Sequence, residues 1–301
     1  MRVALTHTGS AIPEYIKHSI RQIRVFNPHV DIDIITHQGY AESYLDEQTR
    51  EVSIESLNSD ATLLKFRELS WYKAWGRPET VYPSPDNFVQ GTSERMFLLN
   101  AYMKKYNFND VWHFENDNLV YQNLEGVMNV LKTKGLDQDM VCCYMGPKYL
   151  VFNVAFIRDP QMLNDFCVWY ATLLEAGESA IRSRYSMDMV QEMSVLKAYH
   201  DDLGRIKLFP SIPDTDQALG GIYFDPASYG QFIAGTNNGH GSGFRDAVNQ
   251  DIGKEIQAGK ITDVTFVKKF GALVHVGETS YPLFNLHMHN KTRIGEFVTY
   301  E

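Results

Sequence analysis

Two strand-like segments flank an amphipathic helical segment at the start of the chain. The segment RVALTHT, residues 2–8, is typical of a buried strand, and residues 30–38 alternate apolar with acidic side chains. The segment between them has isoleucine at helical spacing, at Ile16, Ile20 and Ile23. A strand, a helix and a second strand in so short a stretch pair the two strands in parallel, because the helix serves as the crossover connection. The chain therefore begins as a βαβ unit, which predicts an α/β fold.

The same alternation of strands and helices continues along the chain. We expect further strands at residues 111–114, 139–145 and 150–158. We expect helices at residues 60–76, 92–106, 160–176 and 186–200, the first capped by Asp60 and the second by Thr92. With 301 residues, the chain can bury a large core and is near the size at which a domain develops a second lobe. We therefore predict a mostly parallel central sheet flanked by helices, with a smaller lobe.

Composition excludes two kinds of partner. The formal net charge is −9 and the basic residues are scattered, so the chain lacks the basic stripe that binds nucleic acid. No apolar stretch approaches the length of a membrane span. The cysteines lack disulfide spacing and indicate reduced thiols: Cys142, Cys143 and Cys167. We expect a soluble cytoplasmic protein, in the host cytoplasm if the source is viral. The sequence leaves the oligomeric state open.

The segment VWHFENDNLVY, residues 111–121, places two acids at the end of an apolar strand. Glu115 and Asp117 project to the same side of an extended segment, and adjacent carboxylates repel each other unless a cation is shared between them. In open α/β sheets, ligands bind beyond the carboxyl ends of the strands. Asn116 and Asn118 favour a turn at this point. The motif by itself therefore leaves two interpretations open, a cation site and a plain polar turn.

A second polar cluster lies in LFNLHMHNK, residues 283–291. The residues alternate from Phe284 onward, so one face of the expected strand is apolar and the other is polar. The polar face carries Asn285, His287, His289 and Lys291. Two histidines at this spacing can reach one metal ion, and imidazole together with carboxylate suits Mn²⁺. The lysine offers a point charge for phosphate. The alternative is a strand with an ordinary solvent-facing polar side.

Four segments, in this order, resemble GT-A glycosyltransferases, the nucleotide-sugar-dependent class. HFENDNLVY is similar to the family's Asp-x-Asp motif, in a Glu-x-Asp form. LVFNVAFIRDPQML resembles the strand that lines the sugar pocket and the helix after it. IYFDPASYGQFIAGT resembles a segment found in some bacterial and viral members, and HMHNK resembles the late histidine and lysine of the metal and diphosphate site.

The resemblance implies a Rossmann-like GT-A domain over residues 1–301, with a nucleotide-sugar-binding half at 1–118 and an acceptor-binding half at 119–301. It implies a Mn²⁺ or Mg²⁺ site made by Glu115, Asp117, His287 and His289. It implies that the donor, a UDP- or GDP-sugar, contacts Thr6, His7, Thr8, Arg95, Glu115, Asn116, Asp117 and Lys291. The sugar, a hexose or pentose, would pass to a hydroxyl of a glycan or another acceptor.

An inverting enzyme also needs a carboxylate that removes the proton of the acceptor hydroxyl. The two candidates for this base are Asp188 in SMDMVQE, which we favour, and Asp225 in YFDPASYGQ. Each has a plainer interpretation, because Asp188 could stabilise a helix N-terminus and Asp225 could sit in a turn. A retaining enzyme needs neither acid in that role, and the sequence leaves the stereochemistry open.

Other functions fit parts of the sequence. A metal-dependent hydrolase or phosphoesterase would use the same acids and histidines, with His7 and His113 as further ligands. A non-catalytic protein that binds sugar nucleotides would keep the site without turnover. The glycine-rich residues 235–244 are expected to form a mobile loop that closes over substrate, or else a plain surface loop.

Overall fold

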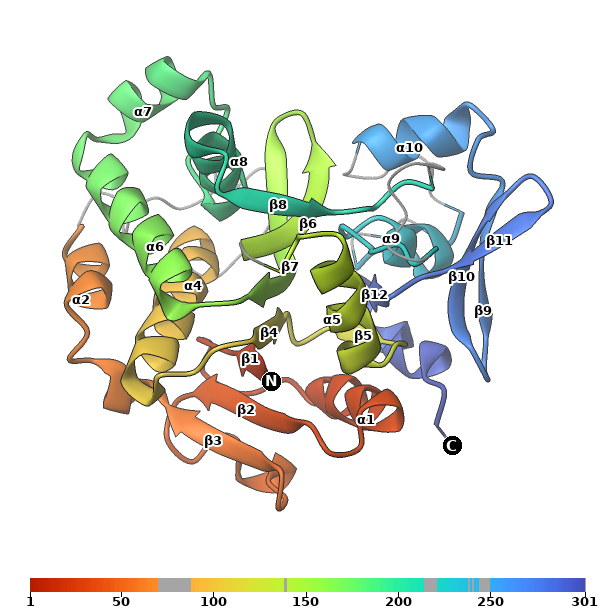
Figure 1. Ribbon diagram of the computed structural model, residues 1–301, viewed down its shortest axis with the longest axis horizontal. Helices are drawn as coiled ribbons and strands as arrows, with labels where there is room; N and C mark the ends of the chain where they lie inside the picture. Colours follow the sequence, from red (N-terminus) through yellow and green to blue (C-terminus); the bar gives the residue numbers. More distant parts are fainter. Residues whose placement is uncertain are drawn as a thin grey trace. The chain divides into compact units, whose positions relative to one another are not determined.

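A computed structural model describes residues 1–69, 88–137, 140–213, 221–237, 239, 241–243 and 250–300. Seven strands form one sheet in the order β3-β2-β1-β4-β7-β6-β8, flanked by helices (Figure 1). The predicted α/β class is therefore confirmed. By internal contacts the chain divides into two compact units. The first comprises Met1–Ile12, Asp31–Trp112 and Ile157–Ile206, and the second comprises Pro13–Val30, His113–Phe156 and Lys207–Glu301.

The first unit contains the parallel strands predicted at the start of the chain. β1 (Arg2–Thr6) pairs in parallel with β2 (Asp31–Thr36), and β2 pairs in parallel with β3 (Thr49–Ser53). Most residues of β1 and β2 are buried on both faces, as expected for parallel strands covered by other elements. The carboxyl ends of β1 and β2 lie at the same edge, with Thr6 opposite Ile35.

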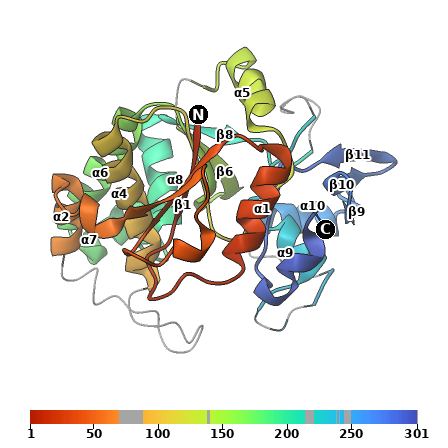
Figure 2. The same ribbon diagram turned by 90° about the horizontal axis from the view of Figure 1, so that it is seen from below.

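The other elements of the first unit are mostly helical. They are η1 (Glu42–Tyr44), η2 (Ile54–Leu57), α2 (Ala61–Glu68), α4 (Phe88–Tyr106), α6 (Pro160–Glu175), α7 (Glu178–Tyr185) and α8 (Glu192–Leu203). Helices α2, α4 and α6 contact one another and lie side by side in Figure 2. Asp60 caps α2 as predicted, since its carboxylate accepts the N–H groups of Thr62 and Leu63 at 3.0 Å each. The end of the predicted helix at 60–76 lies outside the described residues.

Two predicted helix starts are wrong. Thr92 lies inside α4, where its hydroxyl donates to the carbonyl of Val89 at 3.0 Å. The helix predicted at 186–200 begins at Glu192, where the Ser194 hydroxyl accepts the N–H of Gln191 at 3.2 Å and caps the first turn. Asp188 therefore lies in the exposed turn between α7 and α8, and not in the first turn of a helix.

The second unit contains two antiparallel sheets besides its part of the large sheet. β5 (Asn118–Val120) pairs with β12 (Asn285–His287). β9 (Asp263–Val267), β10 (Gly271–Val276) and β11 (Thr279–Pro282) form a meander (Figure 1). β6 (Met140–Gly146) and β7 (Tyr149–Ile157) are joined by a two-residue turn. The chain passes between the units on both sides of residues 13–30, within β4 (Val111–Phe114), near the end of β7 and near the start of β8 (Ile206–Phe209).

The second unit also contains helices, of which α1, α9 and α10 contact its strands. They are α1 (Ile16–Phe26), α5 (Leu124–Thr133), α9 (Tyr229–Ala234), α10 (Gln250–Gln257) and the 3-10 helix η3 (Lys291–Phe297). α1 contacts β5, and its buried Gln22 donates to the carbonyl of Val120 at 3.3 Å and to Thr299 Oγ1 at 2.8 Å. Both units contain segments of the predicted halves 1–118 and 119–301, whose division by function stays a prediction.

Two predictions from composition can be compared with the described residues. The cysteines are buried and free, as the absence of disulfide spacing predicted: Cys142, Cys143 and Cys167. None of the helices formed by the described residues combines the length and the apolar character that a bilayer crossing requires.

Gly271 at the start of β10 provides a test of the packing in the second unit. Its φ is +85°, and a Cβ atom there would lie 2.4 Å from Cγ of Tyr121. Gly271→Ala should lower the free energy of unfolding by about 2–5 kcal/mol, because overpacking adds to the cost of a left-handed alanine. Gly277→Ala is the matched control, since its φ is +59° and no atom lies within 4 Å of the added Cβ. Urea denaturation of both variants measures the difference, and equal losses would contradict the packing argument.

Candidate functional site

The two acids of the opening motif occupy the turn between β4 and β5. The N–H of Glu115 donates to the carbonyl of Asn153 in β7 at 2.9 Å, and the N–H of Asn118 donates to the carbonyl of Glu115 at 3.0 Å. The first residue of the turn, Glu115, is therefore still hydrogen-bonded to β7. The Glu115 and Asp117 side chains retain 17% and 11% of their exposure, so neither acid is carried fully into water. A polar surface turn does not explain this burial.

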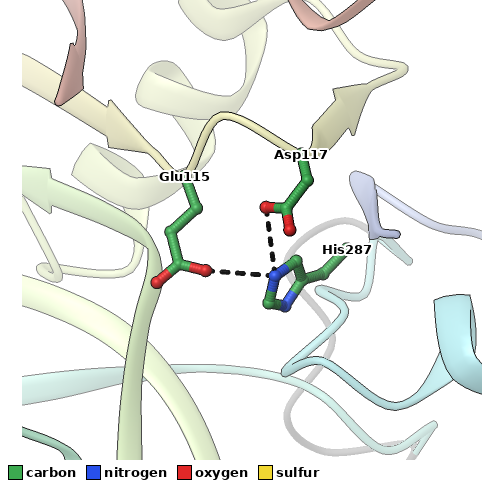
Figure 3. A group of neighbouring side chains, drawn as sticks. All are labelled: Glu115, Asp117 and His287. Atoms are coloured by element: carbon green, nitrogen blue, oxygen red, sulfur yellow. Dashed lines mark ion pairs between the residues drawn. The ribbon is translucent and has the colours of Figure 1, made fainter. Parts of the chain in front are cut away.

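Strand β12 brings a histidine to these acids. Its antiparallel register with β5 sets His287 opposite Asn118, and the N–H of Met288 donates to the carbonyl of Asp117 at 3.0 Å. His287 Nε2 lies 3.0 Å from Glu115 Oε2 and 3.1 Å from Asp117 Oδ1 (Figure 3). Potential ligand atoms of these three residues all lie within 4.8 Å of one another. Three of the four predicted metal ligands are thus brought together from segments about 170 residues apart.

Lys291 places a positive charge beside Asp117. Its Nζ forms an ion pair with Asp117 Oδ2 and donates to the carbonyl of Met288 at 2.6 Å. Burial lowers the pKa of Lys291 to about 8, and the charge of Glu115 opposes this shift. The predicted phosphate-binding lysine and the predicted metal-binding acids therefore form one cluster.

His289 lies beside this cluster but outside the group of three. Its ring centroid is 4.7 Å from that of His287, and its Nε2 is 3.0 Å from the amide nitrogen of Gln231 in α9. Burial, together with the neighbouring His287, lowers the pKa of His289 to about 3. The ring is therefore neutral at pH 7, as a metal ligand must be, but its role as a ligand stays a prediction.

Asp225, a predicted candidate for the base, is fully buried. Its Oδ1 accepts the N–H groups of Ser228 at 2.6 Å and Tyr229 at 2.9 Å, and its Oδ2 accepts those of Gly230 and His287 at 2.9 Å each. Burial raises the pKa of Asp225, and the four backbone donors include groups that oppose this rise. This geometry favours a structural role for Asp225, because the carboxylate reaches no solvent-facing position from which to receive a substrate proton.

Three buried asparagines surround Asp225 and connect the segments that carry the site. Asn153 Nδ2 donates to the carbonyl of Asp225 at 2.8 Å, and Asn285 Oδ1 accepts the N–H of Asp225 at 3.1 Å. Asn285 Nδ2 donates to Asn118 Oδ1 at 2.6 Å, and Asn118 Nδ2 donates to the carbonyl of Asn153 at 3.1 Å. This network was not predicted from the sequence. The feature of the sequence that could have indicated it is an asparagine in each of three apolar strand segments, because a polar side chain buried there needs a hydrogen-bond partner.

Four of the residues predicted to contact the donor lie in the first unit: Thr6, His7, Thr8 and Arg95. β1 ends at Thr6, whose side chain is buried, and burial lowers the pKa of His7. Arg95 Nε donates to the carbonyl of Thr92 at 3.2 Å, and its Nη2 lies 3.9 Å from Oε1 of Glu192. Asp188 also belongs to this unit. The structure does not test the roles predicted for these residues.

An open pocket of about 590 Å³ lies at the carboxyl ends of β1 and β2 in the first unit. It is lined by Thr8, Gly9, Ser10, His37, Gln38, Tyr40 and Glu55. Two acids organise its wall: Glu55 accepts from His37 Nδ1 at 2.7 Å, and Glu51 accepts the N–H groups of Gly39 and Ala41 at 2.8 Å each. The hydrogen bond from His37 lowers the pKa of Glu55 to about 2. Of the predicted nucleotide contacts, Thr8 lines this pocket, whereas His37 and Tyr40 were not predicted.

The glycine-rich residues 235–244 are described only in part. Asn237 Oδ1 accepts the N–H of Lys291 at 3.1 Å, so the start of this segment contacts the candidate site. Residues 238, 240 and 244 lie outside the described residues. The predicted closure of this loop over substrate is not tested by the structure.

Comparison with known proteins gives matches among solved structures alone. No protein-family model and no curated protein matches the chain. Mouse xyloside xylosyltransferase 1 aligns at 8% identity with a TM-score of 0.45, over 69% of this chain and 84% of that one. The galactosyltransferase LgtC aligns at 13% identity with a TM-score of 0.39, over 88% and 98%. A cytidylyltransferase from Leptospira borgpetersenii aligns at 8% identity with a TM-score of 0.36, over 71% and 77%.

Two of these three chains are glycosyltransferases by name. The cytidylyltransferase has a different activity in its name and aligns over a similar share of the chain. At these identities and TM-scores the likeness assigns no activity to this protein.

The neutral state of His289 predicts an acid-sensitive step in stability. In the unfolded chain a histidine takes up a proton near pH 6.5, whereas folded His289 does so only near pH 3. The unfolded state therefore binds more protons between these values, and the free energy of unfolding falls as the pH is lowered through this window. The slope from this group is at most about 1.4 kcal/mol per pH unit. Chemical denaturation of wild type and His289→Gln between pH 7 and 4.5 measures it, and parallel curves would contradict the assignment.

Proposed function

We propose that this protein is a glycosyltransferase that moves a sugar from a nucleoside diphosphate sugar to a hydroxyl group of a glycan or another acceptor, with a divalent cation at the Glu115–Asp117–His287 cluster. The observation that carries the proposal is the convergence of two carboxylates and one imidazole within 4.8 Å, with Lys291 bound to the same aspartate. A cation and a lysine together suit a diphosphate group.

The chemistry of the donor set fits Mn²⁺ or Mg²⁺. Carboxylate oxygens suit both ions, and the imidazole nitrogen favours Mn²⁺ of the two. His287 Nδ1 is buried and has no hydrogen-bond partner among the described residues, whereas Nε2 faces both acids. Glu115, Asp117 and His287 would hold the cation, and His289 is a further candidate from the sequence. The bound cation would supply Lewis-acid stabilisation of the departing diphosphate.

Lys291 would supply fixed positive charge to the same diphosphate. Its ammonium group is held by the carbonyl of Met288 at 2.6 Å, so it is oriented before the donor binds. Preorganised charge of this kind stabilises a developing anion without reorganisation at the moment of reaction. In this proposal Asn116, in the same turn as the acids, contacts the donor.

The nucleoside of the donor is assigned to the first unit. Thr6, His7, Thr8 and Arg95 are the residues that the sequence resemblance implies. The pocket that includes Thr8 adds Tyr40 and His37, whose ring centroids are 5.5 Å apart. Aromatic rings at an open pocket suit the flat face of a base. UDP and GDP are the donor nucleotides to be tested first.

The base of an inverting reaction, if one is needed, is assigned to Asp188. It is exposed in a turn, whereas the carboxylate of Asp225 is enclosed by backbone donors. A retaining mechanism would leave Asp188 without this role. Comparing the anomeric configuration of donor and product by NMR separates the two mechanisms, because an inverting enzyme changes it.

A metal-dependent hydrolase is the alternative function for the same residues. Hydrolases with two metal ions need more ligands than one group of three. Within the described ranges there is a single cluster of three or more candidate ligands, and His113 is not part of it. This count favours a site for one cation. A protein that binds sugar nucleotides without turnover would be recognised by stabilisation with donor and Mn²⁺ but no release of nucleotide.

Asp117→Asn should abolish Mn²⁺-dependent release of nucleotide from UDP- and GDP-sugars. The change removes one charge and keeps the size of the side chain, so the fold should survive. Nucleotide release by the purified protein, with and without Mn²⁺, measures the effect. Asp201→Asn, at an exposed position in α8, is the control and should retain wild-type rates. Wild-type rates in Asp117→Asn would refute the cation assignment.

A double-mutant cycle decides whether His289 shares the cation with Asp117. Asp117→Asn and His289→Gln should each raise the Kd for Mn²⁺, and the double variant should be little worse than the more damaging single change, because both residues act on one ion. Titration of Mn²⁺ followed by electron paramagnetic resonance gives the Kd values. Additive losses would mean that His289 acts elsewhere, with Gln231 as its described partner.

A further inference from the structure

Helix α9 runs along the segment that carries the late half of the site. A Cβ atom at Gly230 would lie 2.1 Å from the carbonyl oxygen of His287, so only glycine permits this approach. One residue further along, Gln231 is 3.0 Å from His289 Nε2. At the end of the helix, the carbonyl of Ala234 accepts from Asn290 Nδ2 at 3.2 Å and Arg293 Nη1 at 3.0 Å. The helix thus packs closely on the segment 287–293 at its start and is hydrogen-bonded to it further along and at its end.

Asp225 joins the start of α9 to β12. One of its oxygens accepts the N–H groups of Gly230 and His287 together, and the other accepts those of Ser228 and Tyr229. The turn between Asp225 and α9 contains Ala227 at a φ of +69°, a conformation that costs an alanine about 1 kcal/mol or more. Such a strained turn persists because the carboxylate fixes both of its sides.

The backbone position of His287 decides whether its ring reaches the acids. The Nε2 distances to Glu115 and Asp117 are 3.0 and 3.1 Å, so a shift of 1 Å in β12 would separate the ring from one or both acids. β12 has three residues, and within the described ranges it pairs with one strand, β5, in its own sheet. So short a strand has few ladder hydrogen bonds to fix its position. The carboxylate of Asp225 provides a further hydrogen bond, which it accepts from the N–H of His287.

We propose that Asp225 is a positioning residue of the candidate cation site, which acts by holding the N–H of His287 while Gly230 packs against the carbonyl of the same residue. The inference rests on the proposed function for the identity of the ligand, but the positioning of His287 can be tested without it. It also replaces the predicted role of Asp225 as a base with one that its complete burial permits.

Asp225→Asn is the first test. An asparagine can accept at one atom only and would turn an N–H₂ group toward backbone donors, so at least two of the four N–H groups lose their acceptor. The Kd for Mn²⁺ in the absence of donor should rise about 10-fold to 100-fold, as is usual when a group that orients a ligand is removed. Electron paramagnetic resonance of free Mn²⁺ measures it. Circular dichroism and urea denaturation identify the conditions under which the variant is folded.

Ser228→Ala is the matched control from the same turn. Ser228 is fully buried and its hydroxyl has no hydrogen-bond partner among the described residues. The variant keeps the backbone N–H that Asp225 accepts, so it should bind Mn²⁺ with wild-type affinity. If it weakens binding as much as Asp225→Asn does, the effect belongs to general repacking of the turn and the proposal fails.

Gly230→Ala keeps the proposal testable if Asp225→Asn does not fold. The added Cβ must displace the carbonyl of His287 while the carboxylate of Asp225 remains. This variant should also weaken Mn²⁺ binding at least 10-fold, since a displaced ligand binds as poorly as one left unoriented. Wild-type affinity in folded Gly230→Ala would overturn the proposal.

A readout without metal separates this inference from the proposed function. The ring ¹⁵N and ¹H signals of His287, assigned with His287→Gln, report its contacts with Glu115 and Asp117 in the metal-free protein. They should move in Asp225→Asn and stay in place in Ser228→Ala. If wild type binds no Mn²⁺ but these signals still move, the cation assignment fails and the positioning role stands. If folded Asp225→Asn keeps both the wild-type signals and the wild-type Mn²⁺ affinity, the positioning role is refuted.

Discussion

The buried hydrogen-bond network around Asp225 is the interaction on which the candidate site depends. Four polar side chains with no exposed surface, Asn118, Asn153, Asp225 and Asn285, join β5, β7, the segment before α9, and β12. Buried polar groups are costly unless each finds a partner, so the network specifies one arrangement of these segments and penalises others. The acids and the histidine meet because this arrangement holds.

The electrostatics of the cluster follow from its partial burial. Glu115 and Asp117 approach the same imidazole, and Asp117 also binds Lys291, so negative charge is matched by neighbouring cationic or hydrogen-donating groups. In surroundings of reduced polarity these contacts are stronger than they would be in water, and a carboxylate left without a partner would be expensive. The same balance explains why an apolar strand can be followed directly by two acids. They are placed beside a histidine and a lysine from the other end of the chain, and a divalent cation fits the same set of ligands.

The pocket of the first unit shows a different use of acids. Glu51 and Glu55 bind backbone and side-chain donors of residues 37–41 and so fix the loop that carries Tyr40. The hydrogen bond from His37 favours the ionised form of Glu55 and lowers the pKa of this carboxyl to about 2. Glu51 and Glu55 hold the backbone that lines the pocket, whereas Glu115 and Asp117 in the second unit offer potential ligand atoms. Residue type alone does not distinguish the two uses.

The sequence by itself determined the class of fold, the positions of several elements and the residues of the cluster. Period-2 and period-3.6 patterns are local, so the βαβ start, β4, β6, β7 and α6 were predictable, as was the cap at Asp60. Helix starts at Thr92 and near Asp188 were predicted wrongly, because a residue suited to capping also occurs inside helices and turns.

Only the tertiary structure decided which of the candidates share a site. Asp225 and Asp188 look alike in sequence, as acids before expected turns or helices, yet one is enclosed by four backbone donors and the other is exposed. Burial and hydrogen bonding to distant backbone depend on how β12 and α9 pack, and no local pattern encodes that packing. The alternation in residues 285–291 identified the histidines and the lysine as candidates. Their partners differ, because His287 lies beside the acids and His289 lies beside Gln231. These partners were determined by the register with β5 and by the close approach at Gly230.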